Sequence, residues 1–215
     1  MLKTKNDNQV YIDGVSLQKI SEMHGTPCYI YSKNSLINEF EEYKKAFKNK
    51  KDILICYSVK ACSNLNILKI FNDLGSGFDI VSLGELERLK YIGADPKKIV
   101  FSGVAKSDEE IKASLEYGIL LFNVESIAEL ENINSIANKM DTKANISIRV
   151  NPDIDPKTHP YISTGLKSSK FGIAIDQAID CLLYTSPSPR DQRGSGFAGC
   201  GWKKKGGGGG GGGGG

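Results

Sequence analysis

Short apolar runs recur along the middle of the chain, and they are rich in β-branched and aromatic residues. This composition is typical of buried parallel strands. The predicted strands are Ile53–Tyr57, Phe78–Val81, Ile99–Phe101, Ile119–Phe122 and Ile146–Val150. They begin 20 to 27 residues apart, which leaves room for one helix between each pair.

The segments between these runs carry apolar residues three or four positions apart, as amphipathic helices do. The stripes are Leu65, Leu68, Phe71 and Leu74; Leu83, Leu86, Leu89 and Ile92; and Ile127, Leu130, Ile133 and Ile136. Capping boxes predict three helix starts, at Ser82 with Glu85, Ser107 with Glu110, and Ser126 with Glu129. Helix ends are predicted at Gly75, Gly93 and Gly118. A longer helix, about Lys33 to Phe47, is expected before the first strand.

Alternating strands and helices of this length predict an α/β fold with a parallel sheet. A (β/α)8 barrel and a doubly wound open sheet are both candidates, but no G-x-G-x-x-G motif follows the first predicted strand. Extrapolated to eight strands, the spacing gives a barrel of about 250 residues, the usual size. The prediction is therefore a partial (β/α)8 TIM barrel that contains five of the eight strands.

The first 35 residues do not follow this alternation of strands and helices. Val10–Ile12, the turn at Asp13-Gly14, and Val15 with Leu17 predict a small hairpin, and Cys28–Tyr31 predicts another strand. His24, next to a glycine, is expected at the end of a helix. We assign residues 1–35 to a separate β domain and residues 36–180 to the first part of the barrel.

The last 35 residues differ sharply in composition. They hold 14 of the 24 glycines, and five Lys or Arg residues against one Asp, so the net charge of +3 comes from this segment. Residues 182–191 resemble a translated sequencing adapter, and ten glycines end the chain. We expect residues 181–215 to be a non-native, disordered tail. The remaining residues are slightly acidic overall, which argues against a nucleic-acid partner.

The chain shows no sign of export or membrane insertion. No apolar run approaches the roughly 20 residues that a spanning helix needs, and no apolar segment follows Met1. Cys28, Cys56, Cys62 and Cys181 have no C-x-x-C spacing, so reduced thiols are expected and no metal site is predicted. A cytoplasmic protein is the resulting expectation.

Lys60 is the main candidate for chemistry. It follows the first predicted barrel strand by two or three residues, and catalytic groups of barrels lie at the C-terminal ends of strands. We expect such a lysine to be partly desolvated, which would lower its pKa and let it act as an amine nucleophile toward a carbonyl. A surface lysine in the same loop would explain the position equally well.

Four segments carry a resemblance to a known family. The segment 57–61 (Y-S-V-K-A) resembles the Schiff-base lysine motif of pyridoxal-phosphate enzymes with an alanine-racemase-like barrel. The segments 77–85 (G-F-D-I-V-S-L-G-E) and 149–152 (R-V-N-P) resemble the ends of their second and fifth strands. The segment 159–165 (H-P-Y-I-S-T-G), followed by S-K-F-G-I at 169–173, is similar to the diaminopimelate decarboxylase signature.

The resemblance implies a lyase that converts meso-2,6-diaminopimelate into L-lysine and CO2, with pyridoxal 5′-phosphate held on Lys60 as a Schiff base. It places Asp79 near Lys60, Arg149 near the cofactor ring oxygen, and His159 beside the substrate. Glu85 also matches a position near the site, although its capping role explains it equally well. The family forms homodimers of a barrel and a β domain.

Other interpretations stay open. A related ornithine or arginine decarboxylase is one, although the segment 159–165 argues against it. A pyridoxal-phosphate homeostasis protein without catalysis is another, although such proteins have no N-terminal β element. The family also has a ring-stacking histidine in a His-x-Gly-Ser segment and a later glycine-rich phosphate site, and neither follows here. We therefore expect the chain as given to be inactive by itself.

Overall fold

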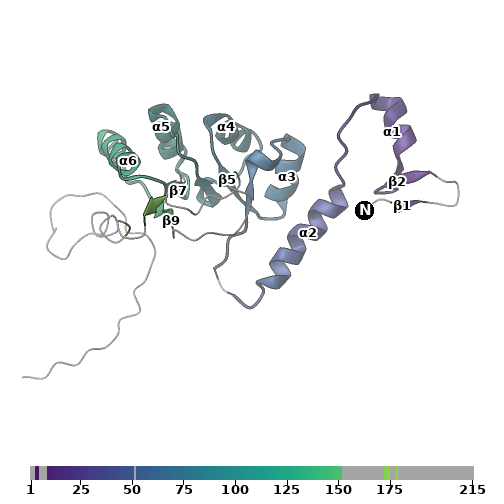
Figure 1. Ribbon diagram of the computed structural model, residues 1–215, viewed down its shortest axis with the longest axis horizontal. Coiled ribbons are helices and arrows are strands. Elements are labelled where there is room, and N and C mark those ends of the chain that lie inside the picture. The colour runs from purple at the N-terminus through teal and green to yellow at the C-terminus, as the bar shows by residue number, and fades with distance from the viewer. Residues whose placement is uncertain (1–2, 5–8, 51, 152–171, 175–177, 179–215) are drawn as a thin grey trace, which may run out of the picture. The chain divides into compact units, whose positions relative to one another are not determined.

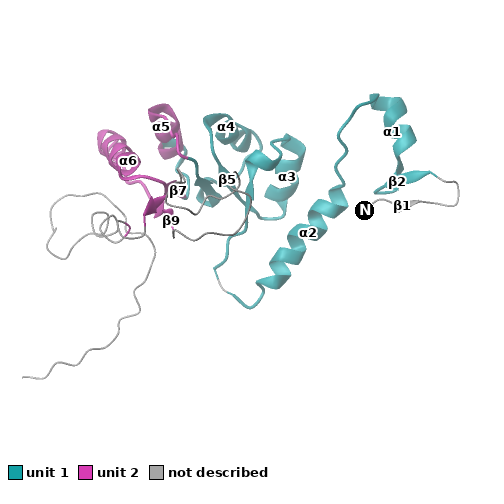
Figure 2. Ribbon diagram, in the orientation of Figure 1, with its two compact units in different colours: residues 1–103, 116–120 teal, residues 104–115, 121–215 magenta. Residues whose placement is uncertain are grey.

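The computed structural model describes residues 3–4, 9–50, 52–151, 172–174 and 178. The chain divides into two compact units. Unit 1 comprises residues 1–103 and 116–120, and unit 2 comprises residues 104–115 and 121–215 (Figure 2). The predicted tail, residues 181–215, lies outside the described residues.

Unit 1 begins with a small antiparallel sheet, which contains the predicted hairpin and one strand, β1, that was not predicted. Its strands are β1 (Lys3–Thr4), β2 (Val10–Ile12) and β3 (Val15–Ser16), with Ile12 opposite Val15 across the hairpin turn. The prediction was wrong for Leu17, which begins helix α1 (Leu17–His24) instead of extending the strand. His24 does end this helix, and Gly25 follows it with a φ of 75°.

The strand predicted at Cys28–Tyr31 does not form. These four residues have no regular secondary structure and are all exposed, with Tyr29 at 93%. Their aromatic and β-branched composition favours an extended backbone, but a strand also needs a neighbour to accept its hydrogen bonds. None of the described strands pairs with them.

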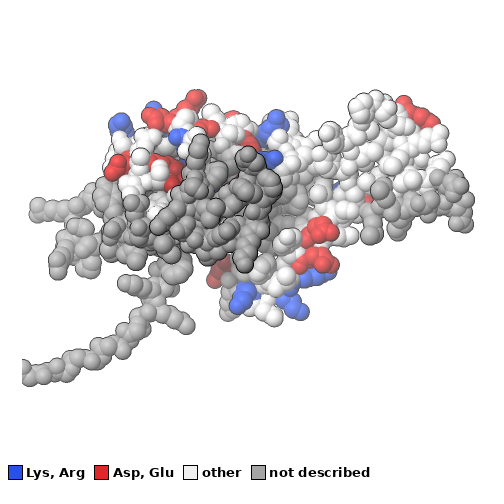
Figure 3. All heavy atoms as spheres, viewed as in Figure 1, with Lys and Arg blue, Asp and Glu red and all other residues white. Residues whose placement is uncertain are grey.

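Helix α2 (Lys33–Ala46) is tied to the hairpin turn through Asp13. Its cap residue Ser32 accepts a hydrogen bond from the Ser35 amide and donates one to Asp13 Oδ1 at 2.8 Å. The Asn34 amide donates to Asp13 Oδ2 at 3.1 Å, and this bond is the main reason why the pKa of Asp13 is lowered. Three acidic residues and then two basic residues occupy the C-terminal part of the helix, and Figure 3 shows both charges there.

The rest of unit 1 alternates strands and helices (Figure 1). Its elements are β4 (Cys56–Ser58), the 3-10 turn η1 (Val59–Ala61), α3 (Leu65–Asp73), β5 (Gly77–Ile80), α4 (Leu83–Tyr91), the 3-10 turn η2 (Pro96–Lys98) and β6 (Ile99–Phe101). The three strands are parallel, with Ser58 opposite Asp79 and Ile80 opposite Phe101. β4 starts three residues later than predicted, because Ile53 and Leu54 lie exposed before it.

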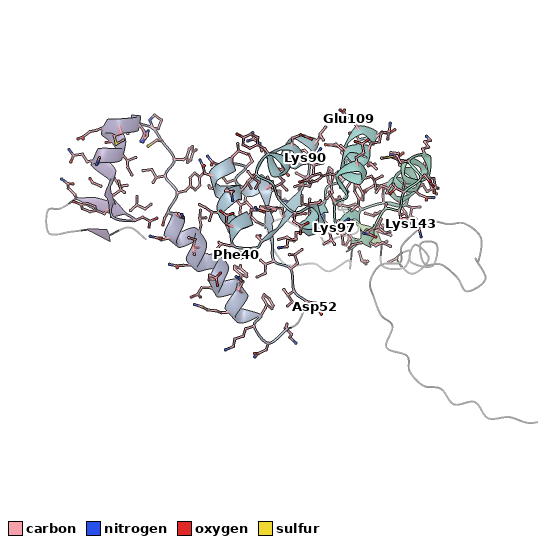
Figure 4. The ribbon with its side chains drawn as sticks, turned by 180° about the vertical axis from the view of Figure 1, so that it is seen from behind. Phe40, Asp52, Lys90, Lys97, Glu109 and Lys143 are labelled. Carbon is pink, nitrogen blue, oxygen red and sulfur yellow. The ribbon has the colours of Figure 1, made fainter. Side chains whose placement is uncertain are left out.

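The core of unit 1 lies between these strands and their helices. Its largest fully buried side chains are Val59, Leu68, Phe78, Ile80, Leu86, Leu89, Ile99 and Phe101. Phe40, labelled in Figure 4, joins α2 to this core through an edge-on contact with Phe71 at a ring-centroid distance of 5.8 Å. The predicted stripes identify the buried faces of α3 and α4 correctly, whereas Ile127 of the third predicted stripe is 44% exposed.

Unit 2 repeats the strand–helix pattern. It contains most of α5 (Asp108–Tyr117), then β7 (Leu121–Val124), α6 (Ile127–Lys139), β8 (Ile146–Ile148), β9 (Val150–Asn151) and β10 (Ile173–Ala174). β7 and β8 are parallel, and β9 pairs in parallel with β10. β7 begins two residues after the predicted start at Ile119, and a break at Arg149 divides the predicted strand Ile146–Val150.

The helix boundaries follow the predicted signals. Gly75, Gly93 and Gly118 all have positive φ angles. In the Ser107–Glu110 capping box, the backbone amide of Ser107 donates a hydrogen bond to the Glu110 carboxylate at 2.9 Å. In the other two boxes, the Glu85 and Glu129 carboxylates accept a hydrogen bond from the backbone amide of the residue before the cap serine, which is Val81 or Glu125. No helix in the described part of the chain is both long enough and apolar enough to cross a membrane.

Candidate functional site

Lys60 lies in turn η1, directly after the C-terminal end of β4. Its side chain is exposed, and the structure gives it no hydrogen bond or ion pair among the described residues. The expected partial desolvation was therefore wrong. The reason is the geometry of the turn, which buries Val59 completely and directs the next residue outward. An exposed amine at a strand end, with no bonding partner in the described part of the chain, is accessible to an aldehyde.

Asp79 is the second predicted site residue, and hydroxyl groups hold both of its carboxylate oxygens. Ser58, its partner in the sheet register, donates to Oδ2 at 3.2 Å. Ser102, the residue after β6, donates to Oδ1. The backbone amide of Ser102 also donates to the Ile80 carbonyl at 2.8 Å, which continues the strand pairing and fixes this serine beside β5. We call Ser58 and Ser102 the serine clamp.

Lys60, Asp79 and Glu85 share one electrostatic environment. Turn η1 contacts β5, and Glu85 lies in the first turn of α4, just after β5. Burial raises the pKa of the Glu85 carboxyl, and the Asp79 charge adds to the rise. The Val81 amide, which donates to Glu85 at 2.7 Å, and the charge of Lys60 both act in the opposite direction. Asp79 and Lys60 therefore both act on the Glu85 carboxyl, and the position of Asp79 near Lys60 stays a prediction.

The turn that carries Lys60 is braced by Tyr57. The Tyr57 ring stacks on Phe71 at a centroid distance of 4.2 Å, and its hydroxyl donates to the Cys62 carbonyl at 3.2 Å. This bond spans residues 58–61 and so closes the turn around Lys60. Burial raises the pKa of the Tyr57 hydroxyl, which keeps it protonated and able to donate.

A cavity of about 430 Å³ lies between α2, α3 and β4. Most of its lining is apolar and includes Leu36, Phe40, Ile55 and Phe71. Neither Lys60 nor Asp79 lines this cavity, although Ser58 does. The charged groups of the site therefore lie outside the cavity, at the C-terminal ends of the strands.

Arg149 lies in unit 2, between β8 and β9. Its guanidinium donates to Glu125 Oε2 at 3.0 Å, and Glu125 is 5% exposed. The Arg149 side chain itself remains 43% exposed. It is therefore a strand-end arginine oriented by a buried carboxylate.

Lys106 of unit 2 has the opposite character to Lys60. Its side chain is 1% exposed, and its amine lies 2.6 Å from Glu129 Oε1 and 2.8 Å from the Asn123 carbonyl oxygen. The lysine thus forms a buried ion pair at the start of α6 and is not accessible.

The sequence reasoning missed Ser58, Ser102, Lys106 and Glu125. Ser58, Ser102 and Glu125 stand at the last residue of a strand or one residue beyond it, which is the one signal that could have identified them. His159 lies outside the described residues. The described residues contain no group of three His, Cys, Asp or Glu side chains able to hold a metal ion.

The chain is similar to known proteins over most of its length. The family model "Pyridoxal-dependent decarboxylase, pyridoxal binding domain" matches residues 33–189. Diaminopimelate decarboxylases from Haemophilus influenzae and Aquifex aeolicus are each 50% identical to it, over 85% and 84% of this chain. These matches cover 44% and 42% of the relatives, so the chain spans less than half of their length.

The chain is also similar to solved structures of diaminopimelate decarboxylases. Diaminopimelate decarboxylase from Helicobacter pylori complexed with L-lysine has a TM-score of 0.76 at 48% identity, covering 80% of this chain and 43% of that one. The enzyme from M. jannaschii, also in complex with L-lysine, has a TM-score of 0.79 at 38% identity, covering 86% and 44%. These likenesses support the partial barrel predicted from the strand spacing.

Proposed function

The chain belongs to the pyridoxal-dependent decarboxylase family, and from this premise we propose that the complete protein converts meso-2,6-diaminopimelate into L-lysine and CO2. The identity of about half of the aligned residues to diaminopimelate decarboxylases supports this substrate. The L-lysine in the related structures is the product of such a reaction. The segment 159–165, similar to the signature of these enzymes, also supports it.

The residues at the strand ends of unit 1 fit pyridoxal 5′-phosphate. The exposed Lys60 amine can bond covalently to the cofactor's aldehyde carbon, and the Asp79 carboxylate can stabilise positive charge nearby. When bound, the cofactor supplies a cationic ring that takes up the electrons left by a departing carboxylate. The observation that carries the proposal is an accessible lysine in the turn after β4, the strand that pairs with β5 and its clamped Asp79.

We assign further roles to the residues named by the family resemblance. Arg149, oriented by Glu125, would approach the cofactor ring oxygen, and His159 would border the substrate. The homodimer, the cytoplasmic location and the division into residues 1–35, 36–180 and 181–215 stay predictions.

The test is a decarboxylation assay on the complete protein with pyridoxal 5′-phosphate. Release of CO2 and formation of L-lysine are followed with meso-2,6-diaminopimelate, and with L-ornithine and L-arginine as competing substrates. Lys60→Ala should abolish turnover, because the covalent attachment point is lost. Lys69→Ala is the matched control, since Lys69 is an exposed lysine of α3 paired with Asp73, and it should retain turnover.

The other interpretations correspond to other outcomes. Faster turnover of L-ornithine or L-arginine would replace the proposed substrate with a related one. Cofactor binding without CO2 release from any of the three would favour a homeostasis protein. Either result would contradict the proposal.

A further inference from the structure

We propose that Ser58 and Ser102 are positioning residues, whose hydroxyls hold the Asp79 carboxylate in one orientation beside Lys60. Asp79 then stabilises positive charge on the nitrogen through which Lys60 holds pyridoxal 5′-phosphate. This inference rests on the proposed function for the identity of the cofactor, but the clamp itself is a feature of the described chain.

The clamp uses both oxygens of the carboxylate. Ser58 donates to Oδ2 and Ser102 to Oδ1. Rotation of the carboxylate about the Cβ–Cγ bond would therefore lengthen both hydrogen bonds at once. Hydrogen bonds to an ionised acceptor are stronger than neutral ones. Two such bonds from opposite sides leave Asp79 a single favoured orientation.

Three adjacent parallel strands assemble the clamp. Ser58 ends β4 and lies opposite Asp79 in the register, while Ser102 follows Phe101, the residue opposite Ile80. The donors therefore come from the strands on either side of β5, and backbone pairing fixes their positions. The serines need no contact with the cofactor to act.

The negative charge of Asp79 acts on two neighbouring titratable groups. Asp79 contributes to the raised pKa values of both Glu85 and Cys56, for which burial is the larger cause. Lys60 acts on Glu85 with the opposite sign. Asp79 and Lys60 thus both act on Glu85 at this edge of the sheet, where a fixed carboxylate has a direct effect on a charged nitrogen.

The test measures the affinity of the complete protein for pyridoxal 5′-phosphate, from the absorbance of the bound cofactor. We expect Ser58→Ala and Ser102→Ala each to weaken binding about tenfold, since each removes one hydrogen bond to a charged group. Ser58→Thr and Ser102→Thr keep a hydroxyl and should restore affinity to within about twofold. Ser114→Ala is the matched control, because it removes a buried hydroxyl that makes no bond to Asp79.

A double-mutant cycle separates positioning from a purely structural role. In an Asp79→Ala background, the serine substitutions should cause no further loss, within about twofold, because they act only through that carboxylate. An equal loss with and without Asp79 would overturn the inference, as would unchanged affinity in both serine-to-alanine variants. Failure of the unsubstituted protein to bind the cofactor at Lys60 would instead contradict the proposed function.

Discussion

Two lysines that follow strands, Lys60 in unit 1 and Lys106 in unit 2, have opposite environments. Lys60 lies two residues after β4 with an exposed side chain, whereas Lys106, five residues after β6, is 1% exposed and paired with Glu129. Position relative to a strand is therefore a weak guide to chemistry. The burial and bonding of the amine distinguish a reactive lysine from a structural one.

The acidic residues near the strand ends of the two units also differ in how their charge is balanced. Asp79 accepts bonds from two neutral hydroxyls and forms no direct ion pair with any residue that the structure describes. Glu129 and Glu125 each pair directly with a cation, Lys106 and Arg149. The strand ends of unit 1 thus retain a charge that can act on a ligand, while those of unit 2 neutralise theirs internally.

The largest expected effect comes from breaking the buried pair. Lys106→Met should lower the free energy of unfolding of the complete protein by about 3–5 kcal/mol, because it leaves the Glu129 carboxylate buried without its cation. Lys60→Met, the matched control at the exposed lysine, should change it by less than about 0.5 kcal/mol. Urea unfolding of the cofactor-free protein measures both. An equal loss of unfolding free energy in the two variants would contradict the difference in environment between Lys106 and Lys60.

A smaller effect is expected at the strand that carries Asp79. In Gly77→Ala, the new Cβ would lie 2.7 Å from the Lys98 carbonyl oxygen and 2.8 Å from Cys56 Sγ, so the strands must move apart. We expect a loss of about 1–3 kcal/mol in unfolding free energy. Gly84→Ala is the control, since its Cβ would meet nothing closer than 4.0 Å. A tolerated Gly77→Ala would contradict the close strand approach that builds the clamp.

Two buried serines sharpen the comparison between the units. The Ser76 hydroxyl in unit 1 reaches two carbonyl oxygens, those of Gly77 at 2.6 Å and Ile55 at 3.1 Å. The Ser114 hydroxyl in unit 2 has no partner among the described residues. Ser76→Ala should therefore cost about 1 kcal/mol, whereas Ser114→Ala should be neutral or slightly stabilising. Thermal unfolding of both variants provides the measurement, and a larger loss at Ser114 would show that its hydroxyl is bonded.

The smallest expected effect is a difference in thiol reactivity. Burial, and secondarily the Asp79 charge, raise the pKa of Cys56, so its reactive thiolate is scarce at pH 8. Cys28 is exposed. Iodoacetamide should therefore label Cys28 first, and labelling of Cys56 should rise on the order of tenfold per pH unit until its pKa is reached. Peptide mapping follows both sites, and faster labelling of Cys56 at pH 8 would contradict this environment.

Sequence patterns predicted the fold better than the site. Strand runs, helix stripes and capping serines depend on local spacing, and the five predicted strands begin within three residues of the observed ones. Cys28–Tyr31 failed because a strand depends on a neighbour that local spacing does not reveal. The serine clamp was missed for the same reason, since Ser58 and Ser102 are 44 residues apart and meet only through the register of β5. The exposure of Lys60 depended on the turn geometry, which its motif does not encode.

The central claim is that Lys60, and not another strand-end lysine, holds the cofactor. The most direct measurement incubates the complete protein with pyridoxal 5′-phosphate, reduces it with borohydride, and locates the modified lysine by mass spectrometry of its peptides. The account predicts modification of Lys60 and none of Lys106, whose amine is buried against Glu129. Modification of Lys106, or of any lysine with Lys60 left intact, would contradict it.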